Sequence, residues 1–149
     1  MELDVIVVTH GGLAVAFREA VQLIMGPQPQ LTTIGFFEGD DPAKIANRIS
    51  AQIHKSSADF HIIFSDLFGA TPSNIALMAV SQCENAAVVT GINLISLIEA
   101  LSLNGEVIDC QSALKRIEKE GRQGVRVLTK ELLQQQRLTS STEKAGQST

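Results

Sequence analysis

The chain is poor in cysteine, in long apolar runs and in charge. Its two cysteines, Cys83 and Cys110, have no CxxC spacing, which favours free thiols in a reducing compartment over a disulfide scaffold. No apolar run is long enough to span a membrane, and the acidic start Met1–Asp4 differs from the basic start of a signal peptide. We therefore expect a cytoplasmic protein with no membrane insertion.

An excess of positive charge is also lacking. The net charge is −4, and residues 1–111 contain 4 Lys/Arg against 12 Asp/Glu. This balance gives no electrostatic basis for binding nucleic acid and favours a basic partner. Residues 112–131 are basic, with 6 Lys/Arg against 3 Asp/Glu, and we interpret them as the solvated face of a helix.

The motifs of several common enzyme classes are absent. The sequence has no GxxxxGK[ST], no GxGxxG and no GxSxG, so nothing favours nucleotide binding or a serine-hydrolase site. The three histidines and two cysteines show no spacing of metal ligands. We expect neither a metal nor a cofactor.

What is present is a regular alternation of β-branched apolar runs with segments of helical periodicity. With 149 residues, 44% of them hydrophobic, the chain has the size of one domain with a sizeable core. The pattern predicts a single-domain α/β fold, doubly wound, with a mostly parallel sheet and helices on both faces. We place the domain at 1–131 and a polar flexible tail at 132–149. The expected strands are 3–9, 31–37, 60–64, 86–90 and a short final one at 125–128.

Two polar residues follow the expected first and third strands. Binding sites of doubly wound sheets form beyond the carboxyl ends of the strands, where His10 and Asp66 are placed. A carboxylate bonded to one imidazole nitrogen leaves the other unprotonated and nucleophilic. Taken singly, His10 is also compatible with an ordinary loop residue and Asp66 with a turn residue. We interpret His54 as the end of a helix and His61 as packing.

The segment after Asp66 predicts an anion site. Gly69 permits a tight turn, and Thr71 is expected to cap a helix whose free N–H groups, through Ser73, would bind phosphate. A nucleophilic imidazole beside an anion site indicates phosphoryl transfer through phosphohistidine.

Four motifs resemble one family. They are VVTHG at 7–11, DLFGATPSN at 66–74, GINL at 91–94, and EGR followed by GV at 120–125. Together they resemble the mannose-family enzyme IIA domain of the bacterial phosphoenolpyruvate:sugar phosphotransferase system (PTS), from Leu3 to about Leu128.

The resemblance implies a phosphotransferase that accepts a phosphoryl group from phospho-HPr and passes it to a IIB component during sugar uptake. His10 would carry the group on Nε2, Asp66 would hold Nδ1, and Thr71 would lie near the phosphate. Relatives are typically homodimers whose last strand crosses to the partner's sheet.

Two departures keep alternatives open. Many transport-linked relatives have proline where this chain has Ile95, and some continue through a linker into IIB, whereas this chain ends in a polar tail. The first alternative is a regulatory PTS protein whose His10 phosphorylation state controls a partner. The second is the phosphodonor subunit of a dihydroxyacetone kinase, although the DLGSA-type run of that branch is missing. The third is a flavodoxin-like domain without phosphohistidine chemistry.

Overall fold

Four apolar runs of the sequence form one parallel sheet. The computed structural model describes residues 1–146, and its strands lie in the order β2-β1-β3-β4. Every neighbouring pair is parallel, with Val5 opposite Leu31 in β2 and Ile62 in β3. The strand bounds are Leu3–His10 for β1, Leu31–Phe36 for β2, Phe60–Ser65 for β3 and Ala86–Thr90 for β4.

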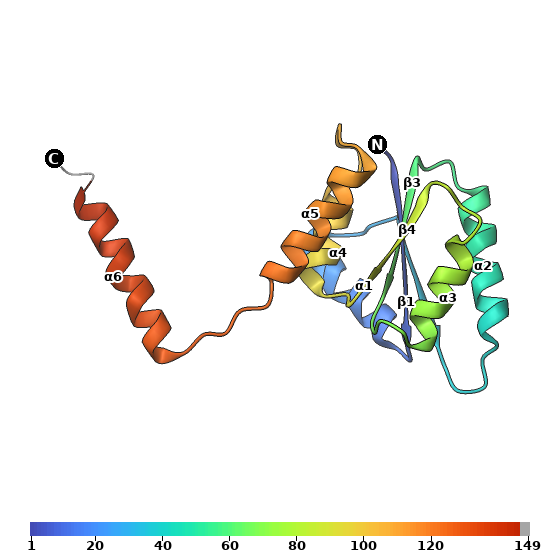
Figure 1. Ribbon diagram of the computed structural model, residues 1–149, viewed down its shortest axis with the longest axis horizontal. Coiled ribbons are helices and arrows are strands. Elements are labelled where there is room, and N and C mark those ends of the chain that lie inside the picture. Colours follow the sequence, from blue (N-terminus) through green and yellow to red (C-terminus); the bar gives the residue numbers. More distant parts are fainter. Residues whose placement is uncertain (147–149) are drawn as a thin grey trace.

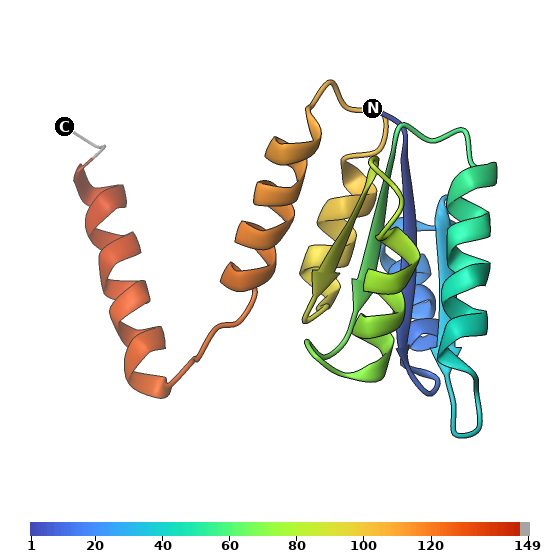
Figure 2. The ribbon, with the colours of Figure 1, turned by 45° about the vertical axis from the view of Figure 1, so that its right-hand side comes forward.

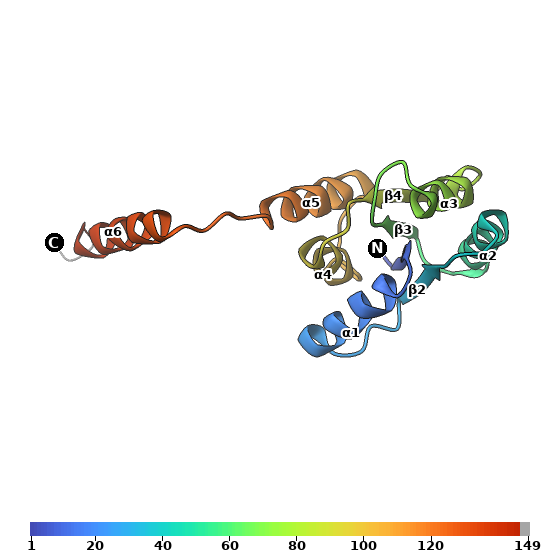
Figure 3. The same ribbon diagram turned by 90° about the horizontal axis from the view of Figure 1, so that it is seen from below.

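Helices cover both faces of this sheet, as the sequence predicts (Figure 3). Three helices cover one face and two cover the other, which confirms the doubly wound α/β architecture. The first layer contains α1 (Leu13–Met25), α4 (Leu94–Ser102) and α5 (Cys110–Gln123); the second contains α2 (Pro42–Lys55) and α3 (Thr71–Val80).

Alternation along the central strand divides the core in two. Val5 and Val7 of β1 pack toward α1, α4 and α5, whereas Ile6 and Val8 pack toward α2 and α3. All four are fully buried. Complete burial of such a side chain stabilises the fold by about 1.5–3 kcal/mol before entropy costs, so β1 anchors both layers. This anchoring fixes the position of the strand's last residue, His10.

The expected final strand does not form within the single chain. Residues 125–128 are extended but pair with no strand within the described residues, and Val125, Val127 and Leu128 are 78%, 76% and 60% exposed. A strand needs a hydrogen-bonded neighbour, and the segment runs away from the sheet instead (Figure 1).

The polar segment that follows is helical rather than irregular. Helix α6 (Lys130–Gly146) stands apart from the domain, with every side chain at 130–145 exposed (Figure 2). The expected boundary between the domain and the tail, at 131–132, stays a prediction. The last three residues of the expected tail, 147–149, lie outside the described residues. No helix within residues 1–146 is long and apolar enough to cross a membrane.

Candidate functional site

His10 and Asp66 meet at the carboxyl edge of the sheet. β1 and β3 are neighbouring parallel strands, so the last residue of one and the residue after the other lie at the same edge. His10 Nδ1 is 2.8 Å from Asp66 Oδ2, and the His10 backbone N–H donates to the same oxygen at 2.9 Å. The Leu67 N–H donates to Oδ1 at 2.9 Å. Both carboxylate oxygens are therefore held in place.

These hydrogen bonds favour the ionised form of Asp66. Partial burial is the largest single influence and by itself raises the pKa of Asp66. The bonds from the His10 backbone and ring and from the Leu67 backbone together outweigh it and lower that pKa below its ordinary value. An ionised carboxylate only accepts hydrogen bonds, so Nδ1 carries a proton and Nε2 of the neutral ring keeps its lone pair. The His10 side chain is 48% exposed and that of Asp66 only 11%, which leaves an oriented, accessible imidazole.

The end of β2 supports His10 from the other side. Phe36 is the register partner of His10, and its carbonyl accepts the Gly11 N–H at 2.8 Å. The two rings form an edge-on contact, with centroids 6.5 Å apart and an interplanar angle of 79°. A Cβ on Gly35 would collide with the Gly11 carbonyl oxygen and with the Phe37 ring, so a glycine is required there. No sequence pattern predicted this support of His10 by the end of β2.

Two helices begin at this edge. Helix α1 starts directly after the glycine pair that follows His10, and Thr9 Oγ1 accepts the Ala14 N–H at 2.8 Å. Helix α3 starts after the loop that contains Asp66, and both N-termini face the same end of the sheet (Figure 2). Their dipoles place positive potential there. From the sequence only the α3 terminus was predicted as an anion site, although a threonine before two glycines and an apolar helix was a usable signal for the α1 terminus.

The three expected phosphate-binding residues have different environments. Gly69 has φ +77°, as a tight turn requires. Thr71 is not the cap: Ala70 is the N-cap residue, because the first helical bond runs from the Asn74 N–H to the Ala70 carbonyl. Thr71 is therefore the first helical residue and is half-buried. Ser73 is fully buried, and its hydroxyl donates to the Ala70 carbonyl at 2.9 Å, so that hydroxyl stabilises the helix start.

The other histidines lie elsewhere. His54 closes the last turn of α2, with Nδ1 2.7 Å from the Ser50 carbonyl oxygen. His61 is fully buried in β3, and its Nδ1 is 3.1 Å from Asp4 Oδ2 at the amino edge of the sheet. Both positions agree with the structural roles expected for them. Within residues 1–146, no three His, Cys, Asp or Glu side chains are grouped as metal ligands.

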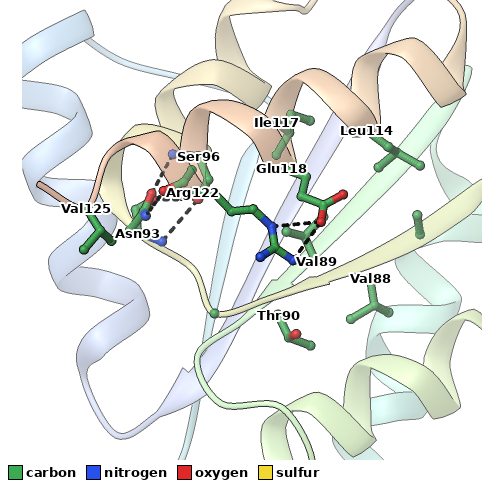
Figure 4. A pocket seen from close by; sticks show the side chains of 13 residues that line it. Val88, Val89, Thr90, Asn93, Ser96, Leu114, Ile117, Glu118, Arg122 and Val125 are labelled. Atoms are coloured by element: carbon green, nitrogen blue, oxygen red, sulfur yellow. Dashed lines mark hydrogen bonds and ion pairs between the residues drawn. The ribbon is translucent and has the colours of Figure 1, made fainter.

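A recess lies between β4 and α5, and its lining does not include His10. It has a volume of about 500 Å³, and its lining includes Val88, Val89 and Thr90 of β4 together with Ile117 and Arg122 of α5 (Figure 4). β4 is an edge strand, so one side of its backbone has no strand partner among the described residues. Such an edge can accept a further strand.

The GINL and EGR motifs contact each other and position the chain where it leaves this recess. Asn93 caps α4 by accepting the Ser96 N–H at 2.8 Å, and its amide donates to the Gly121 carbonyl at 2.8 Å. A Cβ on Gly121 would lie 2.9 Å from Ser96 Cβ, so the two helices meet only with glycine there. Ile95 packs against Gly124. The two motifs thus position the start of the segment at 125–128.

Comparison with known proteins gives a consistent match. A family model described as "PTS system fructose IIA component" matches residues 4–118. The sorbose-specific EIIA component of Lacticaseibacillus casei is 32% identical over 120 residues, covering 79% of this chain and 87% of that protein. The fructose-specific EIIA component of Bacillus subtilis is 25% identical over 131 residues, covering 87% and 89%. The EIIA crystal structure from Streptococcus agalactiae has a TM-score of 0.77 at 20% identity, covering 84% of this chain and 96% of that one.

Proposed function

The chain belongs to the mannose-type enzyme IIA family of the phosphoenolpyruvate:sugar phosphotransferase system, and we propose that it carries a phosphoryl group on His10 between HPr and a IIB component. Members of this family are phosphotransfer components of sugar uptake systems. The observation that carries the proposal is the Nδ1–Asp66 contact of 2.8 Å on a side chain that is 48% exposed. It orients the ring and leaves Nε2 available to a protein donor.

The proposed step exchanges one phosphorus–nitrogen bond for another. The Nε2 lone pair attacks the phosphorus of phosphohistidine on HPr, and the donor's P–N bond breaks with its electron pair returning to the donor nitrogen. Nδ1 keeps its proton, so the His10 ring becomes cationic and pairs with ionised Asp66. Transfer to a IIB acceptor reverses these changes at Nε2.

The surroundings of His10 balance the charge of the bound group. Asp66 stabilises the cationic ring but repels a phosphoryl dianion. The N-termini of α1 and α3 offset that repulsion, each by about 0.3–1 kcal/mol when exposed. We propose Gly69 and the backbone at Thr71 as the phosphate contacts on the α3 side, with Ser73 acting only through the helix it stabilises. A group held in such balance is neither lost to water quickly nor trapped, which suits a carrier.

Intact-protein mass tests the proposal. Incubation with phosphoenolpyruvate, enzyme I and HPr should add one acid-labile phosphoryl group to the wild type and to His54→Ala, whose histidine is exposed on α2. His10→Ala should gain none. A group retained on His10→Ala, or none on the wild type with a donor active on another IIA protein, would overturn the proposal.

We further propose a homodimer in which residues 125–128 of one chain pair with β4 of a second copy. The segment carries three exposed apolar side chains, and β4, five residues long, has an edge beside the recess with no strand partner among residues 1–146. Pairing there would bury the exposed valines and close the edge.

Sedimentation equilibrium tests this assembly. The wild type and Leu23→Asp, altered at an exposed position on α1, should have twice the 16.0 kDa chain mass, whereas Val127→Asp should be monomeric. A wild type that stays monomeric at micromolar concentration would refute the dimer.

A further inference from the structure

Phe36 lies beside His10 on the side of the ring opposite Asp66. β1 runs between β2 and β3, and His10 of β1 is the register partner of Phe36 at the end of β2. Register partners in a parallel sheet project to the same face, so both rings leave the sheet together. Asp66 follows β3 and holds Nδ1 at 2.8 Å, so the opposite side of the His10 ring faces β2. The His10 ring therefore has a carboxylate on one side and an aromatic ring on the other.

The Phe36 ring is itself held in place. It is half-buried and packs against the buried cluster that lies between the sheet and helices α2 and α3. The Phe36 carbonyl accepts the Gly11 N–H at 2.8 Å, which ties the end of β2 to the residue after His10. A side chain that is fixed by the core and by its own backbone can restrict the motion of its neighbour.

The bond to Asp66 does not by itself fix the orientation of the His10 ring. The His10 side chain is 48% exposed, and the torsion about its Cβ–Cγ bond is soft and roughly two-fold. Half a rotation exchanges the places of Nδ1 and Cδ2, so Nδ1 leaves Asp66 and the proton is free to occupy either nitrogen. A neutral ring that carries its proton on Nε2 has no lone pair there with which to attack phosphorus. Transfer through Nε2 therefore requires that the rotation be opposed.

An apolar neighbour opposes this rotation. The two rings are in edge-on contact, with centroids 6.5 Å apart and an interplanar angle of 79°. After half a rotation, Nδ1 would lose the carboxylate and face a side chain that neither donates nor accepts a conventional hydrogen bond. A polar nitrogen left without a partner in such a place is unfavourable. Water in the place of Phe36 would give Nδ1 a new partner and remove the preference.

We propose that Phe36 is a positioning residue, which keeps water from the β2 side of the His10 ring and so holds Nδ1 on Asp66 and Nε2 toward the phosphodonor. This inference rests on the proposed function, which it deepens by naming the side chain that fixes the ring. Asp66 binds Nδ1, and Phe36 leaves Nδ1 no alternative partner. Phe36 acts through His10 and needs no contact with the phosphoryl group.

The experiment compares matched phenylalanine variants. Phe36→Ala opens the β2 side of His10 to water, and Phe36→Leu keeps an apolar side chain there. The controls are Phe17→Ala and Phe17→Leu, because Phe17 of α1 is also half-buried but packs against the core on the other face of the sheet.

The phosphodonor is phosphoramidate, whose small size removes any contribution from protein docking. Nε2 of His10 forms a bond to its phosphorus, the P–N bond of phosphoramidate breaks, and ammonia leaves.

Nitrogen-15 NMR of the unphosphorylated proteins gives the first readout, at a pH where the His10 ring is neutral. The wild type and both Phe17 variants should carry the proton on Nδ1 of His10. In Phe36→Ala a fraction of the molecules should carry it on Nε2, and Phe36→Leu should restore most of the wild-type signal. Burial raises the pKa of Asp66 and hydrogen bonds, including that of the His10 ring, lower it more strongly. That pKa should therefore rise in Phe36→Ala.

The rate of phosphorylation by phosphoramidate gives the second readout. Phe36→Ala should react about three- to tenfold more slowly than the wild type, because only correctly turned rings present the Nε2 lone pair. Phe36→Leu should recover most of the rate, and both Phe17 variants should match the wild type. If Phe36→Ala kept the wild-type proton position, or reacted as fast as Phe17→Ala, the positioning role would be refuted.

The remaining outcomes are equally decisive. An equal loss of rate in Phe17→Ala would assign the effect to general destabilisation and overturn the proposal. If either alanine variant does not fold, the two leucine variants decide by the same readouts: a Phe36→Leu protein identical to Phe17→Leu in proton position and rate would refute the role. Failure of the wild type to accept a phosphoryl group from phosphoramidate and from phospho-HPr would refute the proposed function, whereas the NMR comparison would still decide whether Phe36 orients the ring.

Discussion

The same two strands carry two histidine–aspartate pairs, one at each end. At the carboxyl edge, His10 of β1 contacts Asp66 after β3; at the amino edge, His61 of β3 contacts Asp4 of β1. The Nδ1–carboxylate distances are 2.8 Å and 3.1 Å. The histidine side chain is 48% exposed in the first pair and 0% in the second.

This contrast shows that pairing with a carboxylate does not by itself make an imidazole accessible. Nε2 of His61 is buried without a hydrogen-bond partner among the described residues, so nothing in solution reaches it. Nε2 of His10 lies at the edge where two helices begin and two loops leave the sheet. Parallel strands all end at one edge, which collects the helix N-termini and leaves the opposite edge without them. Under the proposed function, position in the fold gives one pair its chemistry and leaves the other a structural role.

The largest difference should be in the extent of phosphorylation when one histidine or the other is removed. His10→Ala should abolish phosphorylation by phospho-HPr, because no other exposed side chain at this edge offers an oriented imidazole nitrogen. His61→Ala should retain the wild-type extent of phosphorylation at temperatures where it is folded. Intact mass measured on both variants decides this, and equal losses in both would remove the distinction between the pairs.

The second-largest effect should be the difference in phosphorylation rate between variants of the two aspartates. Asp66→Asn should slow phosphorylation by at least about tenfold, because an amide can donate to Nδ1 and favour the wrong tautomer. Asp4→Asn should leave the rate unchanged. Quenched-flow transfer from phospho-HPr measures both rates. A rate for Asp66→Asn equal to that of Asp4→Asn would show that the 2.8 Å contact is not used in transfer.

For the free energy of unfolding, replacing His61 should have a larger effect than replacing His10, the reverse of the effects on phosphorylation. His61→Ala should destabilise the fold by about 2–4 kcal/mol, because it opens a cavity and leaves Asp4 without its partner. His10→Ala should change stability by less than about 1 kcal/mol, since the His10 side chain is half exposed. Urea denaturation of both variants gives the comparison, and a larger cost for His10→Ala would contradict it.

The smallest effect concerns pH. The pKa of Asp66 is lower in the folded protein than in the unfolded chain, so its ionised form stabilises the fold. That contribution is complete above the ordinary carboxyl pKa and is lost as the pH falls through the lowered one. Asp66→Asn should therefore cost about 1–2 kcal/mol at neutral pH and progressively less in acid. A difference in the free energy of unfolding between wild type and variant that is constant from pH 7 to pH 2 would contradict this link between Asp66 ionisation and stability.

Much of this arrangement was predictable because it depends on local pattern. The β-branched runs fix the four strands, and parallel pairing of the first and third brings His10 to Asp66 with no further information. The Asp41–Pro42 start of α2 was equally local: the Asp41 side chain accepts the Ala43 N–H, and proline at the first helical position needs no donor.

The failures arose where tertiary or intermolecular contacts decide the outcome. Residues 125–128 have a strand's composition but lack a strand neighbour within the described residues, so they stay irregular. Phe36 resembles any apolar strand residue until the register places its ring beside His10. The α3 cap lies one residue before the expected Thr71, at Ala70, whose side chain makes no capping hydrogen bond and therefore gives no signal of the boundary in the sequence.

The most direct test of the account is the position of the phosphoryl group on the protein. Nitrogen-15 NMR of histidine-labelled protein, recorded before and after phosphorylation by phospho-HPr, distinguishes Nδ1 from Nε2 in each of the three histidines. The account predicts a bond to Nε2 of His10, with Nδ1 still protonated and the His61 signals unchanged. A phosphoryl group on Nδ1 of His10, or on any nitrogen of His61 or His54, would contradict it.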